Sequence, residues 1–212
     1  MTPVEIYLEQ GKKKVFACAL DWPGWCRAGR DDDKAIEALA ASAERYAAVA
    51  AEAGIALPTG WGSDFEVVER IPGSATTDFG APDKVAARDT EPLDKDPAER
   101  TAALVAATWV IFDRVVAGAP VELRKGPRGG GRDRDKIVAH VGGSEVNYAR
   151  TLGIKSRQPE VRQEIVDVLR VPSDGSRPLA GGKGWPPRYA ARRIAWHVLD
   201  HAWEIEDKSE PA

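Results

Sequence analysis

The chain contains three histidines whose number and spacing suit them to bind a metal ion. His197 and His201 stand four residues apart in RRIAWHVLDHAWEIED, and His140 opens the stretch HVGGSEVNYARTLG. Residues i and i+4 of a helix share one face, so the imidazoles of His197 and His201 can bind one ion together. A third imidazole from another helix would leave open coordination positions on a divalent ion, as catalytic sites require. The zincin protease motif is excluded, because Val198 occupies the position of its glutamate.

The residues around each histidine place it at the edge of an apolar helix face. His197 and His201 have Ile194, Val198 and Ile205 on one side, and polar residues, including Arg193, on the other. His140 has an equivalent apolar flank, formed by Ile137, Val141, Tyr148 and Leu152. We therefore predict that the three imidazoles meet at the seam between two packed helices.

Two acidic residues near the histidine pair are candidate catalytic groups. Asp200 and Glu204 lie on the polar flank of the same predicted helix. Either carboxylate can orient an imidazole through a hydrogen bond or move a proton. The alternative is that both are solvated or form ion pairs with Arg193 and its neighbours.

Four amphipathic helices are predicted in the C-terminal half of the chain. Their ranges are 97–118, 133–153, 159–171 and 186–208. Four such helices favour an antiparallel four-helix bundle over residues 97–212, in which sites form between facing helices.

The N-terminal part has a different pattern. VEIYLEQGKKKVFACAL predicts two strands around a Gly-Lys turn, and DFEVVER predicts another. Between them, Asp31 and the two acids after it are suited to cap a helix that ends at Gly54. Residues 1–70 therefore form a predicted β-β-α-β domain, residues 71–96 have the composition of a linker, and the fold class of the whole chain is α+β.

Composition limits the classes of function. The formal net charge of −3 argues against a protein that binds nucleic acid mainly through phosphates. No run reaches the roughly 20 apolar residues of a membrane span, so we expect no membrane partner and a cytoplasmic location. Cys18 and Cys26 match no metal motif, and a reducing compartment would keep them as thiols, Cys18 in the core and Cys26 as a conceivable reactive group.

A basic loop and a set of tryptophans each have two interpretations, one functional and one structural. The loop RKGPRGGGRDRDK carries Lys125, Arg128, Arg132 and Arg134, which either bind an anionic or sugar-bearing cofactor or belong to a solvated loop. Four tryptophans either line a ligand pocket or anchor the core and the contact between domains. They are Trp22, Trp25, Trp61 and Trp185.

The second and last predicted helices carry a family resemblance. HVGGSEVNYARTLG and WHVLDHAWEIED, within four helices at about residues 95–210, resemble the DinB/YfiT-like four-helix-bundle superfamily. The resemblance implies a divalent ion (zinc first, otherwise nickel or iron) held by His140, His197 and His201. Relatives include thiol-dependent transferases and isomerases that use bacillithiol or mycothiol. The stretch from Tyr7 to Leu39 is similar to the HicB-like antitoxin fold.

These observations lead to a functional expectation and an alternative. We expect a divalent-metal-dependent enzyme that acts with a low-molecular-weight thiol as a transferase or isomerase, or otherwise as a hydrolase, on a small molecule. The alternative is a non-catalytic metal-binding or regulatory protein whose HicB-like domain binds a partner such as a small basic toxin, or one that sequesters metal. Bundles of this kind often pair, so a homodimer is possible.

Overall fold

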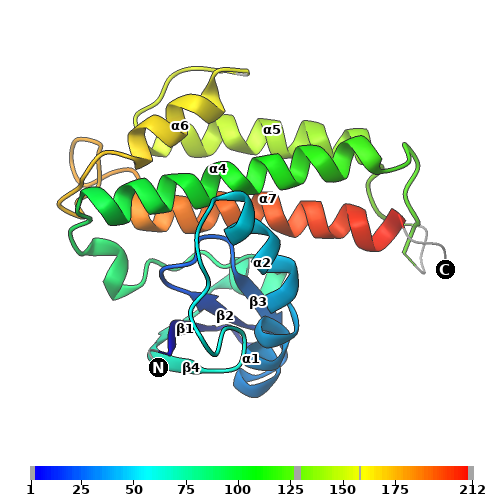
Figure 1. Cartoon of the computed structure of the whole chain (residues 1–212), viewed down its shortest axis with the longest axis horizontal. Coiled ribbons are helices and arrows are strands. Elements are labelled where there is room, and N and C mark those ends of the chain that lie inside the picture. Colours follow the sequence, from blue (N-terminus) through cyan, green and yellow to red (C-terminus); the bar gives the residue numbers. More distant parts are fainter. Residues whose placement is uncertain (1–2, 127–129, 158, 210–212) are drawn as a thin grey trace.

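The computed structural model describes residues 3–126, 130–157 and 159–209. Within those ranges the chain has a mixed α/β fold with a four-stranded sheet and seven α-helices. The long helices lie along one side of the molecule and the sheet lies below them in the view of Figure 1.

The sheet has the strand order β3-β2-β1-β4. Its strands are β1 (Val4–Gln10), β2 (Val15–Ala19), β3 (Cys26–Gly29) and β4 (Phe65–Pro72). Strand β1 pairs antiparallel with β2 and parallel with β4, and β3 adds antiparallel to β2. A parallel pair needs a crossover connection, which the helices between β3 and β4 supply. The sequence predicted β1, β2 and β4 but missed β3, because four residues are too few to show an alternating pattern.

The predicted helix after Asp31 is present but divided. Asp31 caps α1 (Asp32–Ala41) by accepting a hydrogen bond from the backbone N–H of Lys34 at 2.9 Å, as expected. Helix α2 (Ala43–Glu52) begins after a break at Ser42. The Ser42 hydroxyl donates to the carbonyl of Leu39 at 2.8 Å, a local bond that competes with regular helix bonding.

Each face of the sheet packs against a different set of residues. Ile6, Leu8 and Ala17 belong to the large core, which also contains residues of α1, α2 and the long C-terminal helices. On the other face, Phe16 packs edge-on against Trp196, with 6.1 Å between ring centroids. The predicted N-terminal and C-terminal domains therefore share one hydrophobic core.

Two of the four tryptophans singled out in the sequence, Trp22 and Trp25, are buried in that core, and Trp61 and Trp185 pack against it. Trp25 is fully buried and stacks on Trp61 at 4.0 Å, and Trp22 packs against the same ring. The indole N–H of Trp25 donates to the hydroxyl of Ser42 at 3.0 Å. This packing corresponds to the core-anchoring interpretation of these side chains.

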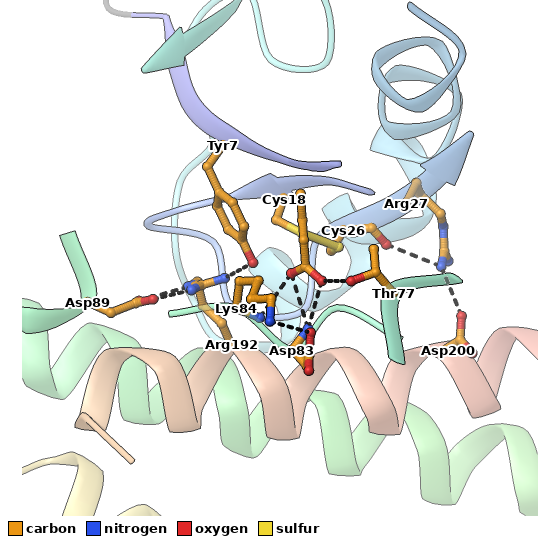
Figure 2. The surroundings of a disulfide bond; sticks show 11 residues. Tyr7, Cys18, Cys26, Arg27, Thr77, Asp83, Lys84, Asp89, Arg192 and Asp200 are labelled. Carbon is orange, nitrogen blue, oxygen red and sulfur yellow. Dashed lines mark hydrogen bonds and ion pairs between the residues drawn. A yellow bond between two sulfur atoms is a disulfide. The ribbon is translucent and has the colours of Figure 1, made fainter. Parts of the chain in front are cut away.

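Residues 71–96, expected to be a linker, contain two short helices, α3 (Ala75–Phe79) and η1 (Ala87–Thr90). The carboxylate of Glu9, which is fully buried in β1, accepts a hydrogen bond from the Thr77 hydroxyl at 2.5 Å. It also accepts bonds from two backbone N–H groups of the loop that follows α3. The segment is thus fixed to the sheet by buried polar contacts (Figure 2).

The C-terminal helices lie within two residues of their predicted bounds. They are α4 (Lys95–Gly118), α5 (Arg134–Thr151), α6 (Val161–Leu169) and α7 (Pro187–Ser209). Helix α7 packs against α4 and α5, and α6 packs against the same two helices. Helix α7 also reaches the sheet, where its Trp196 packs with Phe16 of β2.

The directions of these helices correct the expected antiparallel arrangement. Arg124, just after α4, hydrogen-bonds the carbonyl of Lys208 near the end of α7, and Leu93, just before α4, pairs with Ser173 in the connection that leads to α7. Helices α4 and α7 therefore run in the same direction, whereas α5 runs opposite to both (Figure 1). The connection after α6 brings the chain back beside the start of α4, which makes this parallel contact possible.

Helix α4 is long and apolar enough to cross a membrane by length and composition, with a mean hydropathy of 1.5 over its most apolar window. This differs from the expectation that no segment reaches the length of a membrane span. Half of that window is buried inside the protein. A core helix satisfies the same criterion, so the apolar character of α4 is accounted for by its packing.

Candidate metal centre

The three histidines converge where α5 and α7 pack together. His140 extends from α5, and His197 and His201 extend from α7 one turn apart. One ring nitrogen of each lies within 4.8 Å of the others, and no other group of three or more potential metal ligands of this kind was found among the described residues. His197 and His201 are 7% and 8% exposed, and His140 is half-buried. The convergence expected from the sequence is therefore present.

The spacing of the imidazoles fits a metal ion. The Nε2 atoms of His140 and His197 are 3.2 Å apart. Two nitrogens bound to a tetrahedral zinc ion at about 2.0–2.1 Å would be separated by about 3.3 Å. The His201 ring stands close to perpendicular to both of the others, with centroids 5.0 Å and 4.7 Å away. One ligand nitrogen from each ring lies within 4.8 Å of the other two, so the three rings can together hold an ion.

The protonation states also favour metal binding. Burial lowers the pKa of His197 to about 2, and the nearby His201 and Arg193 add to the effect. Burial likewise lowers the pKa of His140 below its usual value. Both imidazoles are therefore neutral at pH 7, and a neutral imidazole has the lone pair that a metal ligand needs.

Glu204 is placed to orient one of the histidines. Its Oε2 lies 2.7 Å from Nδ1 of His201, and its other oxygen accepts from the ammonium group of Lys208. The bond to His201 is the largest cause that lowers the pKa of Glu204 to about 2. A carboxylate that accepts from Nδ1–H leaves Nε2 of the same ring free for an ion, as in carboxylate–histidine–metal triads.

Asp200, the other candidate catalytic residue, contacts a different group. Its carboxylate forms an ion pair with Arg27 of β3 at 3.4 Å, and it has no hydrogen bond to a histidine among the described residues (Figure 2). The guanidinium of Arg27 also stacks over the ring of Trp203 at 3.7 Å. Asp200 thus connects the sheet to α7, and Arg27 was not identified in the sequence because its partner is distant in the chain.

Two residues next to the histidines were noticed in the sequence only as flanking positions. The ring of Tyr148 on α5 stands edge-on to His197, with centroids 5.5 Å apart. The guanidinium of Arg193 lies 5.6 Å from the centroid of Tyr148 and 4.7 Å from that of Trp196. The spacing along the chain could have identified Arg193 as a neighbour of the site, because it precedes His197 by one helical turn and so shares its face.

The basic loop before α5 is partly neutralised. Lys125 pairs with Asp133, and Arg134 pairs with its neighbour Asp135 at 2.9 Å. Arg128 lies outside the described residues. Arg132 is exposed, has no ion pair within the described part of the chain, and its charge lowers the pKa of both His140 and His197.

The two cysteines form a disulfide, which corrects the expectation of free thiols. Cys18 of β2 and Cys26 of β3 are register partners whose Cα atoms are 4.1 Å apart, and both are buried (Figure 2). The sequence could not show this pairing, because it depends on β3, the strand that the pattern did not reveal. Disulfides are rare in the cytosol, so this bond is at odds with the reducing compartment that was expected for the cysteines.

Comparison with known proteins adds no assignment. No protein-family model, curated protein or solved structure matches the chain significantly. The resemblances to the DinB/YfiT-like and HicB-like families remain predictions made from the motifs.

Proposed function

We propose that the protein is a divalent-metal-dependent enzyme whose centre consists of His140, His197 and His201. The observation that carries the proposal is the convergence of three ring nitrogens within 4.8 Å at a buried helix seam. Three imidazoles with a donor and an acceptor each would be difficult to satisfy in such a place without an ion. Helices α4–α7 then serve as a four-helix bundle of the DinB/YfiT type that supports the site.

The nature of the ligand set suggests the type of chemistry. A divalent ion, zinc first, would supply a Lewis acid that lowers the pKa of a bound thiol or water. Three neutral imidazoles cancel none of the charge of the ion, which favours an anionic ligand such as a thiolate. We therefore favour a thiol-dependent transferase or isomerase with a mycothiol- or bacillithiol-like cofactor, and a small electrophile as substrate.

The residues of the chain have separate parts in this scheme. Glu204 holds His201 in the tautomer that binds through Nε2, and Lys208 holds Glu204 in place. Burial keeps His197 and His140 neutral. Tyr148 packs edge-on against one side of the His197 ring. Asp200 keeps α7 in register with the sheet through Arg27.

Metal analysis tests the foundation of the proposal. Protein purified after metal-replete expression is expected to contain about one equivalent of zinc, nickel or iron. Replacing all three histidines by alanine should remove the ion while circular dichroism shows that the helices remain. Wild-type protein with less than a few tenths of an equivalent would refute a three-histidine centre.

Turnover distinguishes an enzyme from the non-catalytic alternative. The metal-loaded protein should accelerate the reaction of a low-molecular-weight thiol with a generic electrophile, and the triple histidine variant should not. Full metal occupancy with no acceleration for any thiol would refute the catalytic part. Capture of a small basic toxin would then support a regulatory protein.

A further inference from the structure

The charge of Arg193 has no acidic partner within the described residues, where its guanidinium contacts the rings of Tyr148 and Trp196. Its Nη1 atom is buried and makes no hydrogen bond, and the side chain forms no ion pair within the described residues. Asp200, whose carboxylate interacts electrostatically with Arg193, is already paired with Arg27. A buried, unpaired donor costs about 1–3 kcal/mol, and more when it is charged, so such a group calls for an explanation.

A trapped water does not account for this side chain. A cavity of about 10 Å³ borders Arg193 and Trp196, which is room for about one water molecule. A guanidinium has five N–H donors in a planar fork. One water can satisfy only a part of this fork. Arg193 as a whole is only partly buried, and its other nitrogens are not among the buried unpaired atoms, so they remain open to a ligand.

The position of Arg193 relates it to the metal centre. It precedes His197 by one turn of α7, about 6 Å along the axis, on the same face. Tyr148 lies between the two, in contact with the His197 ring at 5.5 Å and with the Arg193 guanidinium at 5.6 Å. The Tyr148 hydroxyl is affected by burial and by the charge of Arg193, and it forms no hydrogen bond within the described residues either. Arg193 and Tyr148 therefore present unused donors beside the three imidazoles.

We propose that Arg193 binds a carboxylate of the molecule that occupies the three-histidine centre. The inference rests on the proposed function and narrows its ligand to a small organic acid, either a thiol that carries a carboxylate or an electrophilic substrate that carries one. The guanidinium fork matches the two oxygens of a carboxylate, which adds orientation to affinity. Arg132, exposed near the same histidines, adds positive charge that attracts such a ligand.

The thiol source is tested with matched probes on cobalt-loaded protein. Mercaptohexanoate and mercaptohexanol have the same thiol and chain, and only the first has a carboxylate. Their dissociation constants are measured from the sulfur-to-cobalt absorption band. Wild-type protein should bind the acid about tenfold more tightly than the alcohol, and Arg193→Gln should remove this preference. Arg150→Gln, which removes an exposed arginine of α5, should retain it.

The substrate source is tested by alkylation. With mercaptohexanol as the thiol, iodoacetate and iodoacetamide each form a carbon–sulfur bond and release iodide, and only iodoacetate carries a carboxylate. A rate advantage for iodoacetate in the wild type that Arg193→Gln alone removes would assign the carboxylate to the substrate.

Metal content, measured on every variant, separates this inference from the proposed function. If wild-type protein binds cobalt and thiols but Arg193→Gln changes neither preference, the carboxylate site is refuted and the metal centre stands. If the wild type binds no metal, both proposals are refuted.

Discussion

Glu204→Gln should weaken zinc binding by about tenfold. The pKa of Glu204 falls from 4.5 to about 2, and each pKa unit corresponds to about 1.4 kcal/mol. The total of about 3 kcal/mol is divided between His201 and Lys208, and the side chain is 26% exposed, so we assign roughly half to His201. About 1.5 kcal/mol is one order of magnitude in affinity, the lower end of the range for groups that orient metal ligands.

The assay is competition for zinc with a chromophoric chelator at neutral pH. Glu206→Gln is the matched control, because Glu206 lies on the same helix and pairs with Arg45 at 2.5 Å. The control should bind zinc as the wild type does, within about twofold. If Glu204→Gln also binds zinc like the wild type, the carboxylate does not orient His201 and the argument from the 2.7 Å contact fails.

Three other predictions concern pH, the disulfide and the buried ion pair between Asp89 of η1 and Arg192 of α7. The folded-state pKa of His197 is depressed, so the unfolded chain binds more protons and the metal-free protein should lose stability as pH falls below about 6.5. Denaturant titrations at several pH values should show this loss, and His197→Gln should reduce it. An equal dependence of unfolding free energy on pH in wild type and variant would contradict the prediction. Thiol titration of the native, non-reduced protein should find Cys18 and Cys26 unreactive, and reduction should lower the free energy of unfolding by about 2.5 kcal/mol. Two titratable thiols after denaturation without reductant would disprove the disulfide and would favour the predicted cytoplasmic location. Asp89→Ala should destabilise the fold by about 3–5 kcal/mol because it leaves the Arg192 charge buried without its partner (Figure 2). If thermal unfolding shows that the variant loses less than about 1 kcal/mol of stability, the pair is not buried in solution.

Local patterns along the chain were enough to locate most elements. Helices α4 to α7 show apolar residues at helical spacing, and β1, β2 and β4 show strand patterns, so each could be recognised from its own residues. The same reasoning identified the metal candidate. The i, i+4 spacing puts His197 and His201 on one face whatever the rest of the fold, and the apolar flank of His140 indicated that it faces a neighbour.

Features that depend on contacts between segments far apart in the chain could not be predicted from local patterns. Strand β3 exists because β2 offers it backbone hydrogen bonds, and the disulfide follows from that pairing. The parallel direction of α4 and α7 depends on how the connection after α6 folds back. The roles of Asp200 and Glu204 also separate only in three dimensions, where Arg27 takes one carboxylate and His201 takes the other.

Spacing along the chain was enough to predict which side chains share a helix face, because helix geometry depends only on that spacing. It therefore determined the histidine pair and the presence of Arg193 on the same face. Packing between helices was needed to show that α5 brings His140 to within hydrogen-bonding distance of His197, and that no acid among the described residues pairs with Arg193. Both depend on packing between segments far apart in the chain, which local periodicity does not encode.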